Sequence, residues 1–409
     1  MIPLSLDEVR ALARGTLEAA PGSTQITGVQ IDSRRIMPGD LFVAVGGGAA
    51  YLDEARARRA AATLVPEDAH EALAALAAAV RDRSDARVVG ITGSTGKTST
   101  KDILFALCAP HAPTIANERS YNAELGVPLT LCRLEPDTEI CIVELAMRGF
   151  GQIAELCAIA RPVVGVVTNV GPAHLELVGS LEGVIRAKSE LIDSLPAGGI
   201  AAVPADFPVG RDDIEVIRVG EPEATTDASG TTVRFDNRDH RFDFHARHQA
   251  RNALTALHTA RALGVTPNTT TKVAFSAWRG EERALPGDGL LIVDCWNANP
   301  ASMRAALEHL AARAGGRRRV AVLGSMAELG AESDRYHREI GEVARASTDL
   351  AIAVGEPARA YQADEWLPDA ATAATRTREL VEPGDCVLVK GSRAVGLELV
   401  AEALTTVSV

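Results

Sequence analysis

Residues 88–101 read VVGITGSTGKTSTK, and this stretch is the strongest indication of the fold. Apolar residues lead into a run of glycine, serine and threonine, and a Gly-Lys-Thr-Ser sequence follows. Small residues let backbone N–H groups curl around phosphate oxygens, and the start of a helix adds partial positive charge. In such a loop Lys97 reaches the terminal phosphates, and the Thr98 hydroxyl binds Mg²⁺. The predicted phosphate-binding residues are Gly93, Ser94, Thr95, Gly96, Lys97, Thr98 and Ser99.

The loop departs from the strict Walker pattern at one position. That pattern has a glycine five residues before the glycine of the Gly-Lys pair, and Ile91 stands there. The flanking pattern still agrees with a phosphate loop, because an apolar strand is predicted before it and a helix after it. We therefore interpret the stretch as a shortened variant and not as a chance glycine-rich turn.

Short β-branched runs alternate with longer Ala- and Leu-rich stretches on both sides of the loop. This alternation favours an α/β fold with mostly parallel sheets. We predict an N-terminal domain over 1–86, a central domain with the phosphate loop over 87–283 and a small Rossmann-like domain over 284–409. The last boundary depends on the turn-prone run PGDG at 286–289.

Periodicity and turn signals place the individual elements. Helices are predicted over 5–14, 69–83, 98–108, 180–194 and 248–263. Strands are predicted over 27–31, 41–45, 63–65, 87–92, 139–144, 163–169, 290–294, 319–324, 349–354 and 386–390. A hairpin is predicted around 236–239, inside a polar and turn-rich stretch.

Composition limits the classes of partner. The 409 residues have a net charge of -12 at pH 7, and 46% are hydrophobic. Nucleic acid is not expected as a partner, because proteins that bind it normally present a basic face. Small anionic ligands remain compatible, since local Lys or Arg residues and a bound cation can overcome a negative total charge.

The six cysteines form no CxxC pair, and most stand in apolar runs. This favours buried, reduced thiols and a reducing cytoplasm. The first residues, MIPLSLDEVR, lack the basic and apolar regions of a signal peptide. No apolar run approaches the roughly 18 residues that a membrane span needs. We expect a cytoplasmic protein that does not contact a membrane, and a monomer by default.

Three residues beyond the loop are candidates for a metal site. Glu144 ends an apolar strand in the domain of the phosphate loop, where a carboxylate can hold Mg²⁺, although an ordinary strand-end charge facing water is the competing interpretation. His174 follows a second apolar strand, and a histidine in such a turn is more often structural than catalytic. Lys188 lies in a predicted helix, where a lone lysine usually faces solvent.

Together these stretches resemble the Mur ligase family. Its members have a shortened phosphate loop, an acid at the end of the next apolar strand, an NVGxxHL-like turn and an Ala-Lys pair, and this sequence has all four in order. The resemblance implies two Mg²⁺ ions held by Thr98, Glu144, His174 and a carbamylated Lys188. It also implies that ATP phosphorylates a substrate carboxylate and that the acyl-phosphate then reacts with an amine to form an amide.

The resemblance extends to the other nucleotide contacts. HQARNAL, which contains Asn252, is similar to the family's HNxxNALAA helix start, so Asn252 is expected to read the adenine. DCWNANPASM begins with Asp294 and is similar to DxYNANPxSM, so Asp294 is expected to accept the ribose hydroxyls. Arg279 is expected at the γ-phosphate, with Arg283 as the competitor for this role. The catalytic residues that the resemblance implies are Lys97, His174, Lys188 and Arg279.

Late segments favour the MurF branch, which adds D-Ala-D-Ala to a UDP-MurNAc-tripeptide. LVKGSRAVGLE at 388–398 and LGSMAELG at 323–330 resemble MurF signatures, and IDSRR and PGDLFVA near the N-terminus extend the match. The N-terminal domain is then expected to bind the acid substrate and the C-terminal domain the amine. The implied substrate contacts are Ser33, Arg34, Asn122, Arg148, Asn297, Asn299, Lys390 and Ser392.

The departures from the family pattern lie where substrates should bind. After Val45 the MurF segment GExFDGHDF is replaced by a shorter GGGAAYLD, and the tyrosine of YNANP is Trp296. One alternative is therefore a paralogue of specialised metabolism that joins a different carboxylate to an amino acid or peptide. A non-catalytic nucleotide-binding protein is disfavoured because the loop lysine and the metal-site residues remain. A folylpolyglutamate synthase-like enzyme is disfavoured by the DSR and PGDLFVA elements.

Overall fold

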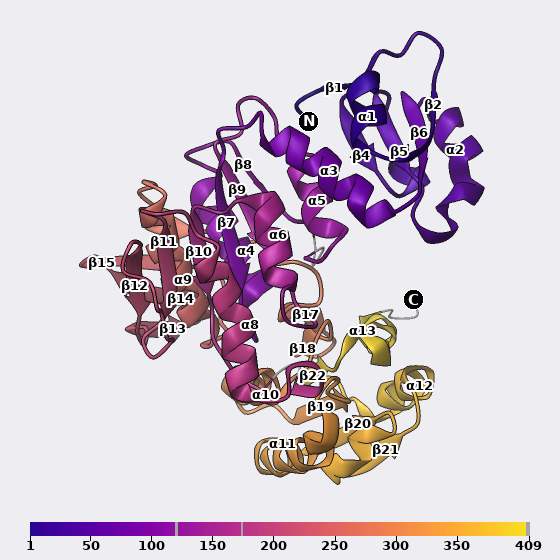
Figure 1. The fold of residues 1–409 in the computed structure, drawn as a ribbon. Coiled ribbons are helices and arrows are strands. Elements are labelled where there is room, and N and C mark those ends of the chain that lie inside the picture. The colour runs from indigo at the N-terminus through magenta and orange to yellow at the C-terminus, as the bar shows by residue number, and fades with distance from the viewer. Residues whose placement is uncertain (119–121, 173–174, 406–409) are drawn as a thin grey trace.

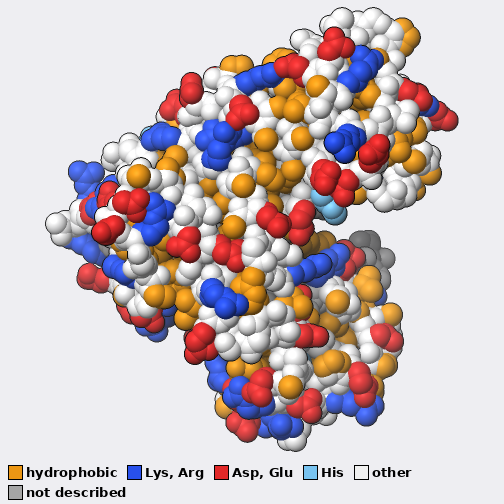
Figure 2. Space-filling view, in the orientation of Figure 1, with side chains coloured by type: hydrophobic (Ala, Val, Ile, Leu, Met, Phe, Trp, Pro, Cys, Tyr) orange, Lys and Arg blue, Asp and Glu red, His pale blue; other side chains and the backbone are white. Residues whose placement is uncertain are grey.

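The computed structural model describes residues 1–118, 122–172 and 175–405. Figure 1 shows a three-domain arrangement, with the indigo N-terminal domain and the yellow C-terminal domain attached to a central domain. The six-stranded sheets of the central and C-terminal domains are parallel but for one edge strand, so the predicted α/β class is confirmed. Figure 2 shows that the surface is hollowed between the N-terminal and C-terminal domains.

The N-terminal domain contains a mixed four-stranded sheet in the order β2-β6-β5-β4. The strands are β2 (Gly15–Ala19), β4 (Gly28–Gln30), β5 (Asp40–Val43) and β6 (Ala62–Pro66), with a ladder between β1 (Leu4–Ser5) and β3 (Gln25–Ile26). The helices are α1 (Leu6–Leu12), α2 (Leu52–Ala57) and α3 (Ala69–Arg81), with 3-10 turns η1 (Ser33–Arg35) and η2 (Gly46–Tyr51). Strand β2 is missing from the sequence prediction, because its mostly exposed residues give no alternating pattern.

The central domain is built on a six-stranded sheet in which every pair is parallel. In spatial order the strands are β12 (Glu215–Val219), β11 (Ile200–Pro204), β10 (Val164–Val167), β7 (Arg87–Thr92), β9 (Ile140–Glu144) and β8 (Thr114–Ala116). The helices are α4 (Lys97–Cys108), α5 (Gly126–Leu131), α6 (Gln152–Ala160), α7 (Leu175–Val178), α8 (Leu181–Asp193) and α9 (Gln249–Ala262). The carboxyl ends of β7, β9 and β10 therefore meet at one edge, where ligands of open α/β sheets bind.

Successive residues of β7 point to opposite faces of this sheet, and each face packs on its own helices. Val89 and Ile91 join the apolar cluster that contains α4 and α9. Val88 joins a second cluster that contains α3, α5, α6 and α8. Gly90 faces Leu191 of α8 so closely that a Cβ there would lie 2.8 Å from a Leu191 methyl carbon. The long helix α8 therefore lies directly against the strand that ends in the phosphate loop.

A small sheet at the far side of the central domain contains the predicted hairpin. Its strands are β13 (Ala224–Asp227), β14 (Gly230–Phe235), β15 (Arg238–Phe242) and β16 (Thr270–Thr271). Asp236 and Asn237 both have positive φ, 49° and 59°, which is the conformation of a two-residue type I′ turn. The hairpin predicted around 236–239 is confirmed.

The C-terminal domain has a six-stranded sheet with one antiparallel edge strand. In spatial order the strands are β17 (Glu281–Leu285), β18 (Gly289–Asp294), β22 (Cys386–Lys390), β19 (Arg319–Gly324), β20 (Leu350–Val354) and β21 (Glu365–Leu367). The helices are α10 (Pro300–Ala314), α11 (Ser333–Ser347), α12 (Ala370–Leu380) and α13 (Glu398–Thr405), with 3-10 turns η3 (Gly330–Glu332), η4 (Pro357–Tyr361) and η5 (Arg393–Val395). The boundary predicted between 283 and 284 falls inside β17, and the exact domain limits stay predictions.

One apolar cluster joins the first two domains, in addition to a separate cluster in each of them. A single cluster runs from Ile2 and Leu4 through Leu73 and Leu76 of α3 to Val143 of the central sheet. The C-terminal domain has two clusters of its own, one on each face of its sheet. All six cysteines are buried free thiols, as predicted. Within the described ranges, no helix is long and apolar enough to cross a bilayer.

Candidate nucleotide and metal site

The phosphate loop connects the end of β7 to the first residue of α4 and depends on two glycines. Gly93 and Gly96 have φ of 150° and 77°, a region that L-residues with side chains rarely adopt. A Cβ at Gly93 would lie 1.9 Å from the Thr168 hydroxyl, and one at Gly96 would lie 2.4 Å from Asn252 Oδ1. The loop is therefore enclosed by the end of β10 on one side and by α9 on the other. Asn252, predicted to read adenine, lies against the loop in this structure.

Gly96→Ala is expected to distort the loop. The left-handed conformation costs a residue with a Cβ roughly 1–2 kcal/mol, and the contact with Asn252 adds to this cost. We expect the free energy of unfolding to fall by at least about 1 kcal/mol and Mg-ADP to bind more weakly, as measured by urea unfolding and calorimetry. Gly171→Ala is the matched control, since its Cβ would meet nothing closer than 4.0 Å. If the two variants have the same free energy of unfolding and bind Mg-ADP equally well, this explanation of the loop geometry is contradicted.

The first residues of α4 bring the loop to the carboxylate of Glu144. Lys97 Nζ donates to the carbonyl oxygen of Gly93 at 2.8 Å, which keeps the ammonium at the loop. The Thr98 hydroxyl donates to one oxygen of Glu144 at 2.9 Å, and Asn122 Nδ2 donates to the other at 2.7 Å. Glu144 is buried, and its two oxygens lie under the loop and do not face water. The competing interpretation of Glu144 as a solvated strand-end charge is wrong.

Lys188 is also buried, at 1% exposure, although a lone helical lysine was expected to face solvent. It lies on the face of α8 that also buries Val184, Ala187 and Leu191. Burial first, and then the charge of Lys97, lower the pKa of Lys188 well below its usual range. Burial likewise lowers the pKa of Lys97, which the nearby Glu144 carboxylate partly offsets. Two amines and one carboxylate thus occupy a common poorly hydrated region.

The donor set suits a hard cation. Mg²⁺ prefers oxygen ligands and is usually held by one or two carboxylates together with substrate phosphates. The Thr98 hydroxyl and the Glu144 carboxylate supply such oxygens beside the phosphate loop. Among the described residues, no three His, Cys, Asp or Glu side chains gather to hold a metal by themselves. The predicted ligand His174 lies outside the described residues.

Two asparagines that were not predicted as site residues order the same edge of the sheet. Asn169, just beyond β10, accepts from the backbone N–H of Thr95 at 2.9 Å and donates to the Thr95 hydroxyl. Asn117, just beyond β8, accepts from the backbone N–H of Glu144 at 2.6 Å. Both asparagines directly follow the carboxyl end of a parallel strand, and this position in the sequence could have identified them as candidate site residues.

The C-terminal domain contacts the loop through the cap of α10. Asn299 caps this helix by accepting from the N–H of Ser302, and its amide nitrogen donates to the carbonyl oxygen of Ser94 at 3.3 Å. Nearby, the buried Lys390 donates to Asp294 Oδ2 at 2.6 Å and to the carbonyl oxygen of Asn297 at 3.0 Å. The predicted ribose acceptor Asp294 therefore forms one cluster with the predicted substrate residues Asn297 and Lys390, close in sequence to the Asn299 contact with the loop.

The structure separates the two candidate arginines. Arg283 lies on β17 and bonds to Glu281 of the same strand through Nε at 2.9 Å. Arg279 lies before β17, where burial lowers the pKa of its guanidinium and the carboxylates of Glu144 and Asp294 partly offset this lowering. Its Cζ is 5.8 Å from the ring centre of Trp296. Of the two, Arg279 is the one whose charge acts on Lys97 of the phosphate loop and is acted on by Glu144.

Other predicted substrate residues lie away from the loop. The Ser33 hydroxyl donates to Glu54 at 2.8 Å, and the Arg34 side chain makes two hydrogen bonds to Asp32, so both are engaged within the N-terminal domain. The Arg148 side chain is exposed on the segment after β9. Ser392 accepts from the backbone N–H of Ala327 at 3.0 Å inside the C-terminal domain.

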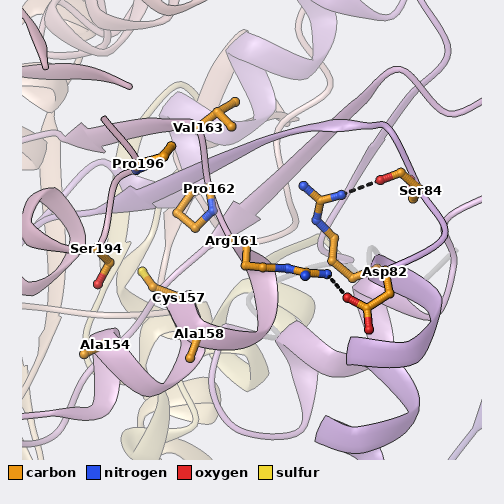
Figure 3. Close-up of a pocket in the computed structure, with 11 residues that line it drawn as sticks. Asp82, Ser84, Ala154, Cys157, Ala158, Arg161, Pro162, Val163, Ser194 and Pro196 are labelled. Atoms are coloured by element: carbon orange, nitrogen blue, oxygen red, sulfur yellow. Dashed lines mark hydrogen bonds and ion pairs between the residues drawn. The ribbon is translucent and has the colours of Figure 1, made fainter. Parts of the chain in front are cut away.

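One cavity of the described residues lies away from this site. It has a volume of ≈ 590 Å³ and lies at the amino end of the central sheet, where Pro162 and Val163 lead into β10. Figure 3 shows Arg161 paired with Asp82 at its edge, and their charged atoms are 2.6 Å apart. The phosphate loop follows the carboxyl end of β7, so this cavity belongs to the opposite edge of the sheet.

The loop, the buried carboxylate and the facing α/β domain define an enzyme that transfers a phosphoryl group of a nucleotide. Residues 91–260 match the family described as Mur ligase middle domain, and residues 279–393 match the family described as Mur ligase, glutamate ligase domain. The chain belongs to the Mur ligase family, whose members are ATP-dependent ligases that form C–N bonds.

Individual relatives place the chain in the MurF branch. It is 33% identical over 455 aligned residues to the UDP-N-acetylmuramoyl-tripeptide–D-alanyl-D-alanine ligase of Escherichia coli K12, with 99% of each chain covered. It is 34% identical to the Mycobacterium tuberculosis ligase of the same name, with 99% and 98% covered.

Solved structures agree with this placement. MurF from Acinetobacter baumannii superposes with a TM-score of 0.85 at 27% identity and covers 98% of this chain and 99% of its own. MurF from Thermotoga maritima in complex with ADP superposes with a TM-score of 0.79 at 29% identity, covering 92% and 96%. The family resemblance drawn from the sequence is confirmed.

Proposed function

We propose that this protein is a MurF-type ligase that joins D-alanyl-D-alanine to a UDP-N-acetylmuramoyl-tripeptide at the expense of ATP. The observation that supports this most is the buried network of Thr98, Glu144 and Asn122 under the phosphate loop, in a chain that aligns end to end with ligases of that name. A cytoplasmic, monomeric enzyme acting on small molecules, without nucleic acid or membrane partners, agrees with this activity.

The chain's own residues suit phosphoryl transfer to a carboxylate. An oxygen of the substrate carboxylate attacks the γ-phosphorus, the bond to the bridging oxygen breaks, and ADP leaves with the electron pair. Lys97 and Arg279 place positive charge where negative charge develops on the transferring group. The amine nitrogen then attacks the acyl carbon, inorganic phosphate leaves and a proton is released. Thr98 and Glu144 would hold Mg²⁺, which would supply positive charge to the phosphate oxygens.

We further propose that Lys188 is carbamylated and that the site holds two Mg²⁺ ions. Carbamylation joins the lysine nitrogen to the carbon of CO₂ and releases a proton, and it requires the neutral amine. Burial and Lys97 together favour that neutral form, since they lower the pKa of Lys188. The product is an anion beside the cationic Lys97, and it would supply the second carboxylate-like ligand that a paired metal site needs.

The remaining assignments belong to the same proposal. ATP would occupy the loop, with its base near Asn252 and its ribose near Asp294, and His174 would complete the metal site. The acid would bind between the N-terminal domain and the segment after β9, and the amine beside the C-terminal domain. The proposed substrate contacts are Ser33, Arg34, Asn122, Arg148, Asn297, Asn299, Lys390 and Ser392.

The test is phosphate release from ATP in the presence of UDP-MurNAc-tripeptide and D-Ala-D-Ala, with mass spectrometry of the product. We expect the pentapeptide product to form in a one-to-one ratio with phosphate. The short 3-10 turn Gly46–Tyr51, which replaces a longer MurF segment, makes the acid the substrate to vary first. Phosphate release only with another acid and amine would contradict the proposed substrates and support the alternative of a paralogue in specialised metabolism.

A further inference from the structure

Two groups of the proposed metal site come from different elements, and one carboxylate joins these elements. Lys188 lies on α8, whereas Glu144 ends β9 and is followed by the segment 145–151, which leads into α6. Glu190 of α8 accepts from the backbone N–H of Gly151 at 2.7 Å, of Ile153 at 3.1 Å and of Ala154 at 3.2 Å. A single side chain two residues after Lys188 therefore holds the end of the segment that begins at Glu144.

The contact is chemically favourable because α6 begins without a cap of its own. Its N-cap residue is Gly151, in the left-handed conformation at φ 85°, and a glycine has no side chain to accept the free N–H groups. The carboxylate of Glu190 accepts from three of these groups and carries a negative charge at the positive end of the helix. The interaction thus fixes both the start of α6 and the position of α8 beside it.

A second contact lies on the same face of α8, one turn earlier. The guanidinium of Arg186 lies 3.8 Å from the ring centre of Phe150, the residue before Gly151. Residues four apart share a face of a helix, and Lys188, between Arg186 and Glu190, points to the opposite face. That face is the buried one that packs on the sheet. The contacts of Arg186 with Phe150 and of Glu190 with Gly151 therefore fix the rotation of α8 about its axis, and this rotation determines the direction of Lys188.

The held segment is itself ordered from its other side. Gln152 Oε1 accepts from the backbone N–H groups of Arg148 at 2.6 Å and Gly149 at 3.1 Å. Arg148 is thereby presented on a closed turn between Glu144 and α6. The position of this turn depends on α8, because Glu190 is the acceptor for Gly151 at its end.

We propose that Glu190 is a positioning residue of the ligase reaction, which sets the distance and direction of Lys188 relative to Glu144 by holding α8 to the start of α6. This role rests on the proposed function of Lys188. Glu190 does not touch the reacting groups; it acts through Lys188. A displacement of about 1 Å at a reacting group can cost on the order of 10²-fold in rate, so a loosened α8 is expected to lower turnover without removing the nucleotide site.

The experiment compares Glu190→Ala and Glu190→Gln with Glu155→Ala, which removes an exposed acidic side chain from the first turn of α6. We expect Glu190→Ala to lower kcat by about 10²-fold while the KM for ATP changes less than about threefold. Glu190→Gln keeps one acceptor oxygen and should recover at least about tenfold of that loss. Glu155→Ala should leave kcat unchanged. A folded Glu190→Ala with normal kcat would overturn the proposal. If this variant does not fold, Glu190→Met, which keeps the side-chain length but accepts no hydrogen bond from α6, is measured in its place, and a normal kcat of that variant would overturn the proposal.

A double variant separates this proposal from the function on which it rests. If Glu190 acts through Lys188, adding Glu190→Ala to Lys188→Ala should reduce kcat by less than about threefold further. If kcat of the double variant falls below that of Lys188→Ala by as much as Glu190→Ala alone lowers it, the positioning role is overturned. In that case a low kcat of Lys188→Ala itself still supports the proposed function of Lys188. Normal turnover of Lys188→Ala would overturn both.

Discussion

We expect Lys97→Met to lower kcat by about 10³-fold and to change the free energy of unfolding little. Removal of one well-placed electrostatic donor at a reacting centre typically lowers the rate by about 10²–10³-fold. Lys97 Nζ donates to the carbonyl oxygen of Gly93 in the loop, and we propose that it acts on the transferring phosphoryl group. Methionine keeps the length of the side chain, so the packing between the loop and α4 is retained. Because burial already disfavours the charged form of Lys97, its replacement by a neutral group should not reduce the free energy of unfolding.

The measurement is steady-state phosphate release, together with urea unfolding of the same preparations. Lys272→Met is the matched control, because Lys272 is an exposed lysine outside the site. It should leave kcat and stability unchanged. A Lys97→Met enzyme that keeps kcat within tenfold of the unmodified protein would contradict the assignment of Lys97 to the transferring phosphoryl group.

Lys188→Ala is expected to reduce turnover to a similar extent, and added bicarbonate should not restore it. If Lys188 carries a carbamate, the unmodified enzyme should lose activity in CO₂-depleted buffer and regain it when bicarbonate is added. The variant lacks the nitrogen that reacts with CO₂, so its residual activity should not respond. Lys188→Met, which keeps most of the buried volume, separates loss of the anion from the cavity that alanine would leave.

The readouts are kcat with and without bicarbonate, and the intact mass of a peptide containing residue 188 after rapid quenching. Near-normal activity of Lys188→Met would exclude both the carbamate and any other catalytic role of this lysine. Loss of activity in that variant without any bicarbonate response of the unmodified enzyme would retain Lys188 as a catalytic residue and contradict the carbamate.

Local sequence predicted the parts of the site that depend on neighbours in the chain. The glycine pattern, Lys97 and Thr98 follow one another directly, and Glu144 stands at the end of a readable apolar strand. The order of the strands in space could not be read in this way, so the contact between Thr98 and Glu144 was an implication of the family resemblance and not of spacing. The confirmed hairpin at Asp236 and Asn237 shows the same rule, because its turn chemistry is entirely local.

The features of the site that the sequence did not predict depend on packing between segments that are distant in the chain. The burial of Lys188 follows from the packing of α8 on the central sheet, which the helical pattern alone does not reveal. Asn299 reaches the loop only because the C-terminal domain docks there, and its side chain bridges 205 positions in the sequence to Ser94. Glu190 appears in the sequence as one more charge on a helix, and its role becomes visible only beside the uncapped start of α6.

The apolar core that runs from the N-terminal domain through α3 into the central sheet has a thermodynamic consequence. Residues that share one core cannot lose their packing independently, so these two domains form one cooperative unfolding unit. The C-terminal domain, with separate cores on the two faces of its sheet, forms a second unit that can change its docking as a rigid body without melting either. The three domains therefore form two cooperative units, and the junction between these units lies at the phosphate loop, where Asn299 contacts Ser94.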